Sequence, residues 1–136
     1  MKKIFFALLI FIFAGCSDVS NAYVEKTVDV DLTVLNAIML SGELNNIFVN
    51  NPNNYIGKTI KVNGTYTESF PGENNEIFHF VLVYIDSCCT PRPIMFFPAG
   101  EFISPELGTQ IEVTGIFNEF PEYDLYYLDE SEVVAI

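Results

Sequence analysis

Apolar and polar residues alternate differently along the first and later parts of this chain. Over residues 24–34 apolar and polar residues alternate with a period of two, which is typical of an extended segment or strand. Over residues 35–50 the apolar positions instead recur at helical spacing, although Gly42 within this stretch weakens the pattern. Residues 50–52, ending in proline, then stop the expected helix. Its apolar stripe consists of Ala37, Leu40, Leu44, Ile47 and Phe48.

The later part of the chain contains a repeat. Residues 57–66 and 108–117 each carry glycine, then isoleucine, valine, a second glycine and an aromatic residue at alternate positions. Alternate positions of a strand share one face, so each segment is expected to direct these residues toward a core. The second glycines, Gly64 and Gly115, predict bent positions that let a small sheet curl into a barrel.

Three further segments complete the expected sheet. Residues 77–86 are apolar on both faces, which predicts a central strand covered on both sides. Residues 94–97 form a short strand after a proline-rich break, and residues 123–134 form the last strand. Five strands with an irregular connection at 99–107 match the order of an OB-fold barrel. Another small barrel or a sandwich is the alternative.

We therefore predict a mainly β fold, a five-stranded OB-fold-like barrel preceded by one α-helix. The length of the chain favours a single domain over residues 24–136. Residues 24–56 would supply its extended segment and helix, and residues 57–136 its barrel.

The N-terminus has the features of an export signal. Lys2 and Lys3 precede an apolar run over residues 4–14, which is too short to span a bilayer comfortably. Ala14 and Gly15 then place two small residues before Cys16. We predict a signal peptide over residues 1–15, a lipid on Cys16 and a tether over residues 16–23. An ordinary signal peptide with a chance cysteine is the alternative.

Charge narrows the range of partners. The chain has 18 acidic residues against six Lys and Arg, and removal of the signal peptide would leave four of these cations. Residues 93–136 contain nine Asp or Glu and no Lys or Arg. Such a surface repels phosphate backbones, so nucleic-acid binding is disfavoured. The charge is also explained by a simple need for solubility near a membrane.

Several motifs resemble a family of uncharacterised bacterial OB-fold proteins, many of which are lipoproteins. The resemblance covers residues 31–134. It implies an OB-fold and a location at the cell envelope, and it implies no activity. The residues after the paired cysteines depart from the family pattern, which weakens a metal role there. The matching motifs are Asp31-Leu32-Thr33, Asn51-Pro52, Tyr55-Ile56-Gly57-Lys58, Gly64, Ile85-Asp86, Cys88-Cys89, Gly108 and Val113-Thr114-Gly115-Ile116-Phe117.

Cys88 and Cys89 are the candidate ligand or redox site, together with Asp86. Adjacent cysteines make a strained disulfide, because neighbouring Cα atoms lie about 3.8 Å apart across a trans peptide. A soft metal would need three or four ligands, and His79 is the one histidine available as a further weak candidate. A lone histidine on an apolar strand face is more often a packed, hydrogen-bonded residue than a ligand. Packing is likewise an alternative role for the two cysteines.

Other chemistry has less support in the sequence. No nucleophile motif or phosphate-binding loop is present, so we expect no catalysis and no resident cofactor. The acidic residues of the last hairpin could bind calcium but lack the spacing of a calcium loop. An aromatic region around the same hairpin could serve as a stacking surface, with core and rim packing as the alternative. The acidic set is Glu119, Glu122, Asp124, Asp129, Glu130 and Glu132, and the aromatic set is Phe117, Phe120, Tyr123, Tyr126 and Tyr127.

These observations leave two functional hypotheses. The first is a membrane-anchored, extracytoplasmic binding or assembly module that engages an envelope protein or small ligand. The second is a soft-metal or thiol-redox protein using Cys88 and Cys89.

Overall fold

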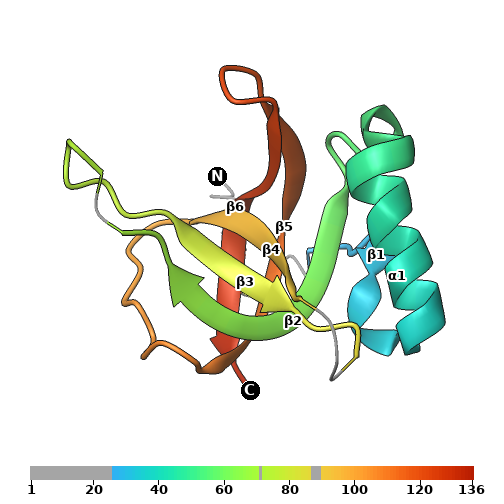
Figure 1. The fold of residues 1–136 in the computed structure, drawn as a ribbon, viewed down its shortest axis with the longest axis horizontal. Helices are drawn as coiled ribbons and strands as arrows, with labels where there is room; N and C mark the ends of the chain where they lie inside the picture. Colours follow the sequence, from blue (N-terminus) through green and yellow to red (C-terminus); the bar gives the residue numbers. More distant parts are fainter. Residues whose placement is uncertain (1–25, 71, 87–89) are drawn as a thin grey trace, which may run out of the picture.

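Five strands close into a barrel in the computed structural model, which describes residues 26–70, 72–86 and 90–136. The strands hydrogen-bond in the order β2-β3-β4-β6-β5, and β5 pairs back with β2 (Figure 1). β4 and β6 run parallel and the other barrel pairs run antiparallel. This closure and the single preceding helix confirm the predicted OB-fold-like barrel. The barrel strands are β2 (Thr59–Glu68), β3 (His79–Val83), β4 (Arg92–Pro98), β5 (Gln110–Phe120) and β6 (Leu125–Ala135).

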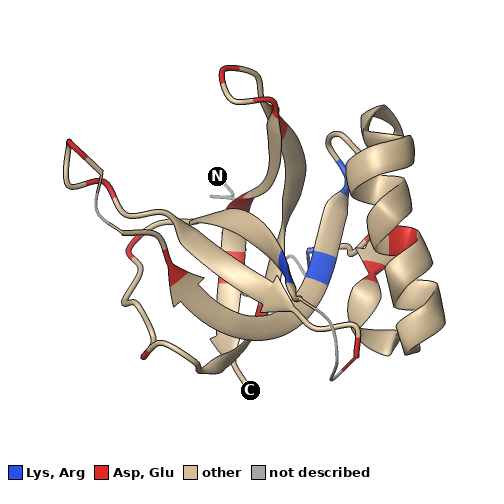
Figure 2. Cartoon of the chain, in the orientation of Figure 1, with Lys and Arg blue, Asp and Glu red and all other residues tan. Residues whose placement is uncertain are grey.

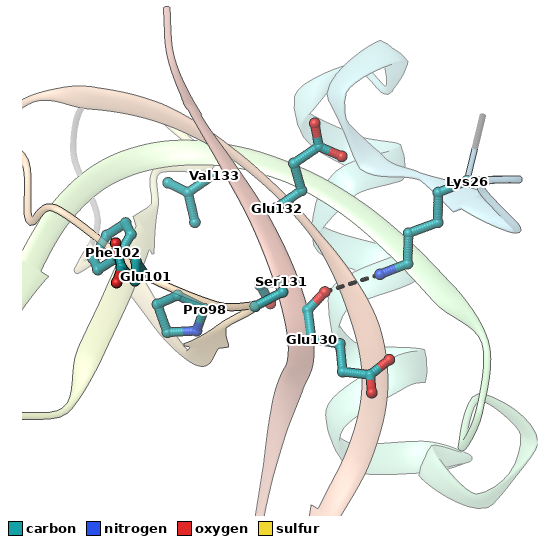
Figure 3. Close-up of a pocket in the computed structure, with 9 residues that line it drawn as sticks. Lys26, Pro98, Glu101, Phe102, Glu130, Ser131, Glu132 and Val133 are labelled. Carbon is teal, nitrogen blue, oxygen red and sulfur yellow. Dashed lines mark hydrogen bonds between the residues drawn. The ribbon is translucent and has the colours of Figure 1, made fainter. Parts of the chain in front are cut away.

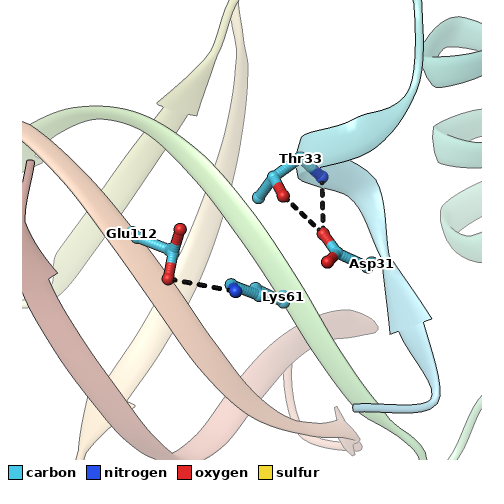
Figure 4. A network of polar contacts seen from close by, with 4 residues as sticks. All are labelled: Asp31, Thr33, Lys61 and Glu112. Atoms are coloured by element: carbon cyan, nitrogen blue, oxygen red, sulfur yellow. Dashed lines mark hydrogen bonds and ion pairs between the residues drawn. The ribbon is translucent and has the colours of Figure 1, made fainter.

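The segment before the helix is less extended than expected. Only β1 (Val30–Asp31) is a strand, and it pairs in parallel with β2. The Asp31 carboxylate accepts hydrogen bonds from the backbone N–H and the hydroxyl of Thr33, as Figure 4 shows. This local contact competes with strand pairing and turns the chain into the 3₁₀ helix η1 (Leu32–Val34). Of the extended segment or strand expected over residues 24–34, the described part thus contains one two-residue strand, and residues 32–34 are helical instead.

The helix α1 (Ala37–Asn45) begins two residues later than expected and covers one side of the barrel (Figure 1). Its start is set by Asn36, whose side chain accepts a 3.0 Å hydrogen bond from the backbone N–H of Met39. The chain continues as a π-helical turn, η2 (Asn46–Asn50), followed by the short 3₁₀ helix η3 (Pro52–Asn54). Among the described residues, no helix has the length and apolar character needed to cross a bilayer.

Side chains from every barrel strand and from the helical segment fill the core. Leu44 and Ile47 of the helical segment are fully buried, whereas Ala37 on the predicted stripe is exposed. Burial of such aliphatic and aromatic side chains is the main favourable contribution to folding. The apolar barrel residues of this core are Ile60, Val62, Tyr66, Val81, Val83, Ile94, Phe96, Ile111, Val113, Phe117 and Leu128.

The two repeated sequence segments pair with each other as β2 and β5. Val62 is opposite Val113 at the centre, and Ile60 is opposite Gly115 on one side. On the other side Gly64 is opposite Ile111, so the pairing has local two-fold symmetry. Each isoleucine therefore packs across from the glycine of the other segment, which explains why the two residue types occur together in the repeat.

The turns that lead into these strands share the symmetry. Gly57 has φ +85° and Gly108 has φ +88°, a left-handed conformation that strongly favours glycine. The Gly57 N–H donates to the Phe117 carbonyl at 2.8 Å, and the Gly108 N–H donates to the Tyr66 carbonyl at 3.0 Å. The first glycine of each repeat thus turns the chain into its strand and fixes the register of β2 against β5.

Three expectations about strand boundaries were wrong. β3 spans only His79–Val83, and its outward side chains Phe80 and Leu82 remain partly exposed, so it is not covered on both faces. β4 already begins at Arg92, because proline is tolerated in the first residues of a strand. Tyr123 lies in the turn before β6, where Asp124 has a positive φ of 53°.

Candidate binding groove

Two hairpins frame one outer face of the barrel. The β2–β3 connection spans residues 69–78, and the β5–β6 turn spans residues 121–124. Both extend beyond the body of the barrel, with β3 and β4 between them in Figure 1. The outer face of strands in these positions, together with these two loops, is where OB-folds in general bind their ligands.

An apolar groove lies between these hairpins and has a volume of about 230 Å³. Its walls come from both hairpins and its floor from β3 and β4. We call it the aromatic groove, and its lining residues are Phe78, Phe80, Met95, Phe120, Tyr123 and Leu125.

Strand alternation explains why these side chains point outward. Val81 of β3 and Phe96 of β4 are buried inside the barrel, so their neighbours Phe80 and Met95 face the other side. On β5 the buried Phe117 leaves Phe120, three residues later, on the outer face. The groove is therefore built from the outward positions of strands whose inward positions form the core.

Contacts between aromatic rings hold the wall of the groove in place. Phe97 has its ring centroid 5.0 Å from that of Tyr127 and 6.3 Å from those of Phe78 and Phe120. Phe120 in turn stacks on Tyr123, with 5.2 Å between centroids and an interplanar angle of 20°. Offset and edge contacts of this kind are favourable beyond simple area burial. The surface is therefore preorganised before any partner arrives, although Tyr123 remains 64% exposed.

Acidic residues occur on both hairpins that frame the groove. Exposed acidic residues lie on both hairpins, whereas residues 62–91 and 93–136 contain no Lys or Arg. Figure 2 shows acidic positions on the tips of both hairpins. The groove is thus an apolar surface with a rim of one sign of charge. We call the acidic residues of the two hairpin loops the rim, and they are Glu73, Glu76, Glu122 and Asp124.

The predicted aromatic region divides between two places. Phe117 is fully buried and stacks on Tyr126 at 5.2 Å, while the edge of Phe48 from the helical segment also contacts it. Phe120 and Tyr123 line the groove instead. Phe117 and Tyr126 therefore pack at the core, as the packing alternative predicts, whereas Phe120 and Tyr123 lie on an outer groove. Sequence reasoning missed Phe78, Phe80, Met95 and Phe97, although the apolar character of both faces of residues 77–86 and 94–97 was the available signal.

The cysteine site cannot be placed, because Cys16, Cys88 and Cys89 lie outside the described residues. Asp86 is exposed at a bend after β3 and lines a hollow beside α1 together with Ile38 and Ile85. His79 begins β3, so the strand alone separates the two by roughly 13 Å at about 3.3 Å per residue. His79 and Asp86 are therefore not brought together as ligands of one ion.

His79 is instead packed at the end of the barrel among aromatic rings. Its ring packs against those of Tyr66 and Phe96, with centroids 5.9 Å and 5.8 Å away, and contacts the edge of Phe102 at 4.9 Å. Its Nδ1 atom lies 2.7 Å from the Tyr66 hydroxyl, which donates to Glu68 at 2.9 Å. A hydroxyl has one proton, so both contacts are satisfied when the His79 Nδ1–H donates to Tyr66.

Burial determines the protonation of this cluster. Desolvation lowers the pKa of His79 below its usual value of 6.5, against an opposing effect of the Glu68 charge. Desolvation, supported by the hydrogen bond and charge of Glu68, raises the pKa of Tyr66 to about 12. Both side chains are therefore neutral at pH 7, as a packed and hydrogen-bonded histidine should be.

A second, more polar hollow of about 420 Å³ lies beside β6 (Figure 3). Lys26 donates a 2.9 Å hydrogen bond to the Glu130 carbonyl there and links the N-terminal segment to the barrel. Glu101, Glu130 and Glu132 point in different directions in Figure 3. Across residues 26–70, 72–86 and 90–136, no three His, Cys, Asp or Glu side chains converge as metal ligands, including the acidic set considered for calcium.

The outer wall of β2 and β5, away from the groove, carries the ion pair between Lys61 and Glu112 at 3.4 Å (Figure 4). Both side chains are about 30% exposed or less, and such a partly exposed pair contributes little to stability. This pair therefore serves mainly as a contact between the two strands.

Comparisons of the chain with protein-family models, with curated proteins and with solved structures found no match. The resemblance to the OB-fold lipoprotein family thus stays a prediction, and the aromatic groove is interpreted from its own geometry.

Proposed function

We propose that this protein is a non-catalytic binding module of the bacterial cell envelope, anchored by a lipid on Cys16, which engages its partner through the aromatic groove. The groove is the observation that carries this proposal. An exposed aromatic surface between two hairpins lowers the solubility of a protein. Exposed apolar patches of this kind commonly mark interaction sites.

Binding is favoured over catalysis by the residues that line the groove. They are aromatic or aliphatic, and the Tyr123 hydroxyl is their one oxygen-bearing side-chain group. General acid–base or nucleophilic chemistry needs titratable side chains within hydrogen-bond reach of the substrate. The lining offers a contact surface and lacks such a constellation.

Site-specific photo-crosslinking tests this proposal. In one variant of the full-length protein, a benzophenone amino acid would replace Tyr123 in the groove. In a matched variant it would replace Val134. Both variants would be expressed in bacteria and crosslinked in the cell envelope. Val134 is 48% exposed, and β6 places it about 30 Å from Leu125 at about 3.3 Å per residue. We expect a discrete adduct from position 123 and none from position 134. Equal adducts at both positions, or none at position 123, would contradict a groove-based function.

A further inference from the structure

Resting on the proposed function, we infer that the partner is a cationic peptide segment of another protein, which inserts one large apolar side chain into the aromatic groove between flanking Lys or Arg residues. The size of the groove, its polarity and the charge of its rim each point to this class of partner.

The volume of the groove favours a single side chain over a free small molecule. Small-molecule sites usually enclose about 300–1,000 Å³ and bury most of the ligand. The groove has about 230 Å³ and is open on one side. One phenylalanine, leucine or tyrosine side chain can occupy it while the rest of a peptide remains outside.

The polarity of the groove argues against a sugar. A carbohydrate carries many hydroxyl groups, and burying them without hydrogen bonds is costly. Within the lining, Phe78, Phe80, Phe120 and Leu125 have no polar side-chain atom. Aromatic and aliphatic anchors lose no hydrogen bonds in such a place, and they are the residues that dominate protein–protein interfaces.

The rim supplies the charge selection. Glu73 and Glu76 belong to one hairpin loop, and Glu122 and Asp124 to the other. No Lys or Arg lies in either hairpin loop to compensate them. A partner with basic residues on both sides of its anchor would neutralise both hairpins at once, since complementary charge favours encounter and correct orientation.

The same charge opposes self-association through this face. Two copies that apposed their grooves would bring four acidic hairpins together, and like-charge contacts across an interface are unfavourable. Lys58, Lys61 and Arg92, the chain's described cations apart from Lys26, lie outside the hairpin loops at residues 69–78 and 121–124. A second copy of this chain therefore lacks the complementary surface that the groove requires.

Fluorescence anisotropy with labelled peptides tests this inference on the full-length protein purified in a neutral detergent. The main probe has a central phenylalanine between two pairs of lysines. One matched peptide replaces every lysine with glutamine, and another replaces the phenylalanine with serine. We expect the main probe to bind, and each replacement to weaken binding by roughly tenfold or more. Added salt should weaken the main probe, because the rim charges are exposed.

Protein variants locate the binding. Tyr123→Ser and Phe120→Ser should each weaken the main probe by at least tenfold, whereas Val134→Ser should not. Glu122→Gln/Asp124→Asn should weaken it several-fold, while Glu101→Gln/Glu106→Gln, which removes two exposed charges outside the hairpins, should leave it unchanged. Circular dichroism of each variant would establish that the fold is retained.

Four results would overturn the inference. They are equal binding of the lysine and glutamine peptides, equal binding of the phenylalanine and serine peptides, no binding of the main probe, and self-association that Tyr123→Ser abolishes. If crosslinking from position 123 succeeds while the peptide preferences fail, the binding function stands and the cationic partner is wrong. Failure of both experiments removes the groove as a functional site.

Discussion

At the scale of single residues, Gly64 and Gly115 show how tightly the barrel is packed. An ideal Cβ on Gly64 would lie 2.2 Å from the Leu82 carbonyl oxygen, and one on Gly115 would lie 2.3 Å from the Ser131 hydroxyl and 3.0 Å from the Asp129 carbonyl oxygen. Neither glycine is in the left-handed region. The sequence correctly placed both in strands, but the close approach of a neighbouring strand is a tertiary contact that the repeat alone does not reveal.

Gly64→Ala is therefore expected to destabilise the protein by about 1–3 kcal/mol or more, because backbone atoms of β3 must move. Urea unfolding followed by circular dichroism measures this change. Gly72→Ala is the control, since a Cβ there would meet nothing within 4 Å and its φ lies outside the left-handed region. Equal stability of the two variants would show that β2 and β3 approach less closely than described.

His79 gives a pH-dependent prediction at the same scale. Burial lowers its pKa in the folded state below the usual 6.5, so the unfolded chain binds the proton more readily. The stability associated with the neutral ring is thus complete above pH 6.5 and is lost as the pH falls through the lower folded pKa. When the pH is lowered from 7.5 to 5.5, the free energy of unfolding should therefore fall less for His79→Phe than for the wild-type protein. Parallel pH profiles of the two proteins would exclude this role.

At the scale of elements, the periodic pattern identified the helix and every barrel strand but not their ends. The ends depend on particular side-chain hydrogen bonds that a hydrophobic pattern does not indicate. Examples are the Asn36 cap of α1 and the Asp31 contact that terminates β1. The aromatic groove was partly visible from the sequence, through Phe120 and Tyr123. The rest of it depends on the pairing of β3 with β4 and of β4 with β6, which joins distant segments.

Gly42 of α1 provides a prediction about the helix. The residue is exposed, and a Cβ there would contact nothing, so Gly42→Ala should stabilise the protein by about 0.5–1 kcal/mol through helix propensity. Gly57→Ala has equally open space but a φ of +85°, and it should destabilise by about 1–2 kcal/mol. Thermal or urea unfolding of both variants checks the contrast. Changes of the same sign would mean that one of these backbone conformations is wrong.

At the scale of the whole molecule, charge and anchoring work together in the proposed function. Cationic residues outside residues 1–15 are confined to Lys26, Lys58, Lys61 and Arg92, so the loops of the two hairpins carry acidic residues and no basic ones. A lipid on Cys16 would confine this surface to a thin layer beside the membrane. Confinement raises the effective concentration of the module for partners in the same layer, which compensates for the modest affinity of a small groove.

The anchor itself is the last prediction, and it follows from residues 1–16 alone. The thiol of Cys16 is the atom that would carry the lipid, so Cys16→Ala should abolish lipidation and release the protein from the membrane fraction or leave its signal peptide uncleaved. Mass spectrometry of the native N-terminal peptide measures this directly, with Ser17→Ala as a control that keeps the thiol. A single acyl chain binds membranes only marginally, so stable anchoring requires more than one. We therefore expect the wild-type peptide to begin at Cys16 with several acyl chains. A mature N-terminus without lipid would refute the anchor and leave the groove to be tested as the site of a soluble exported protein.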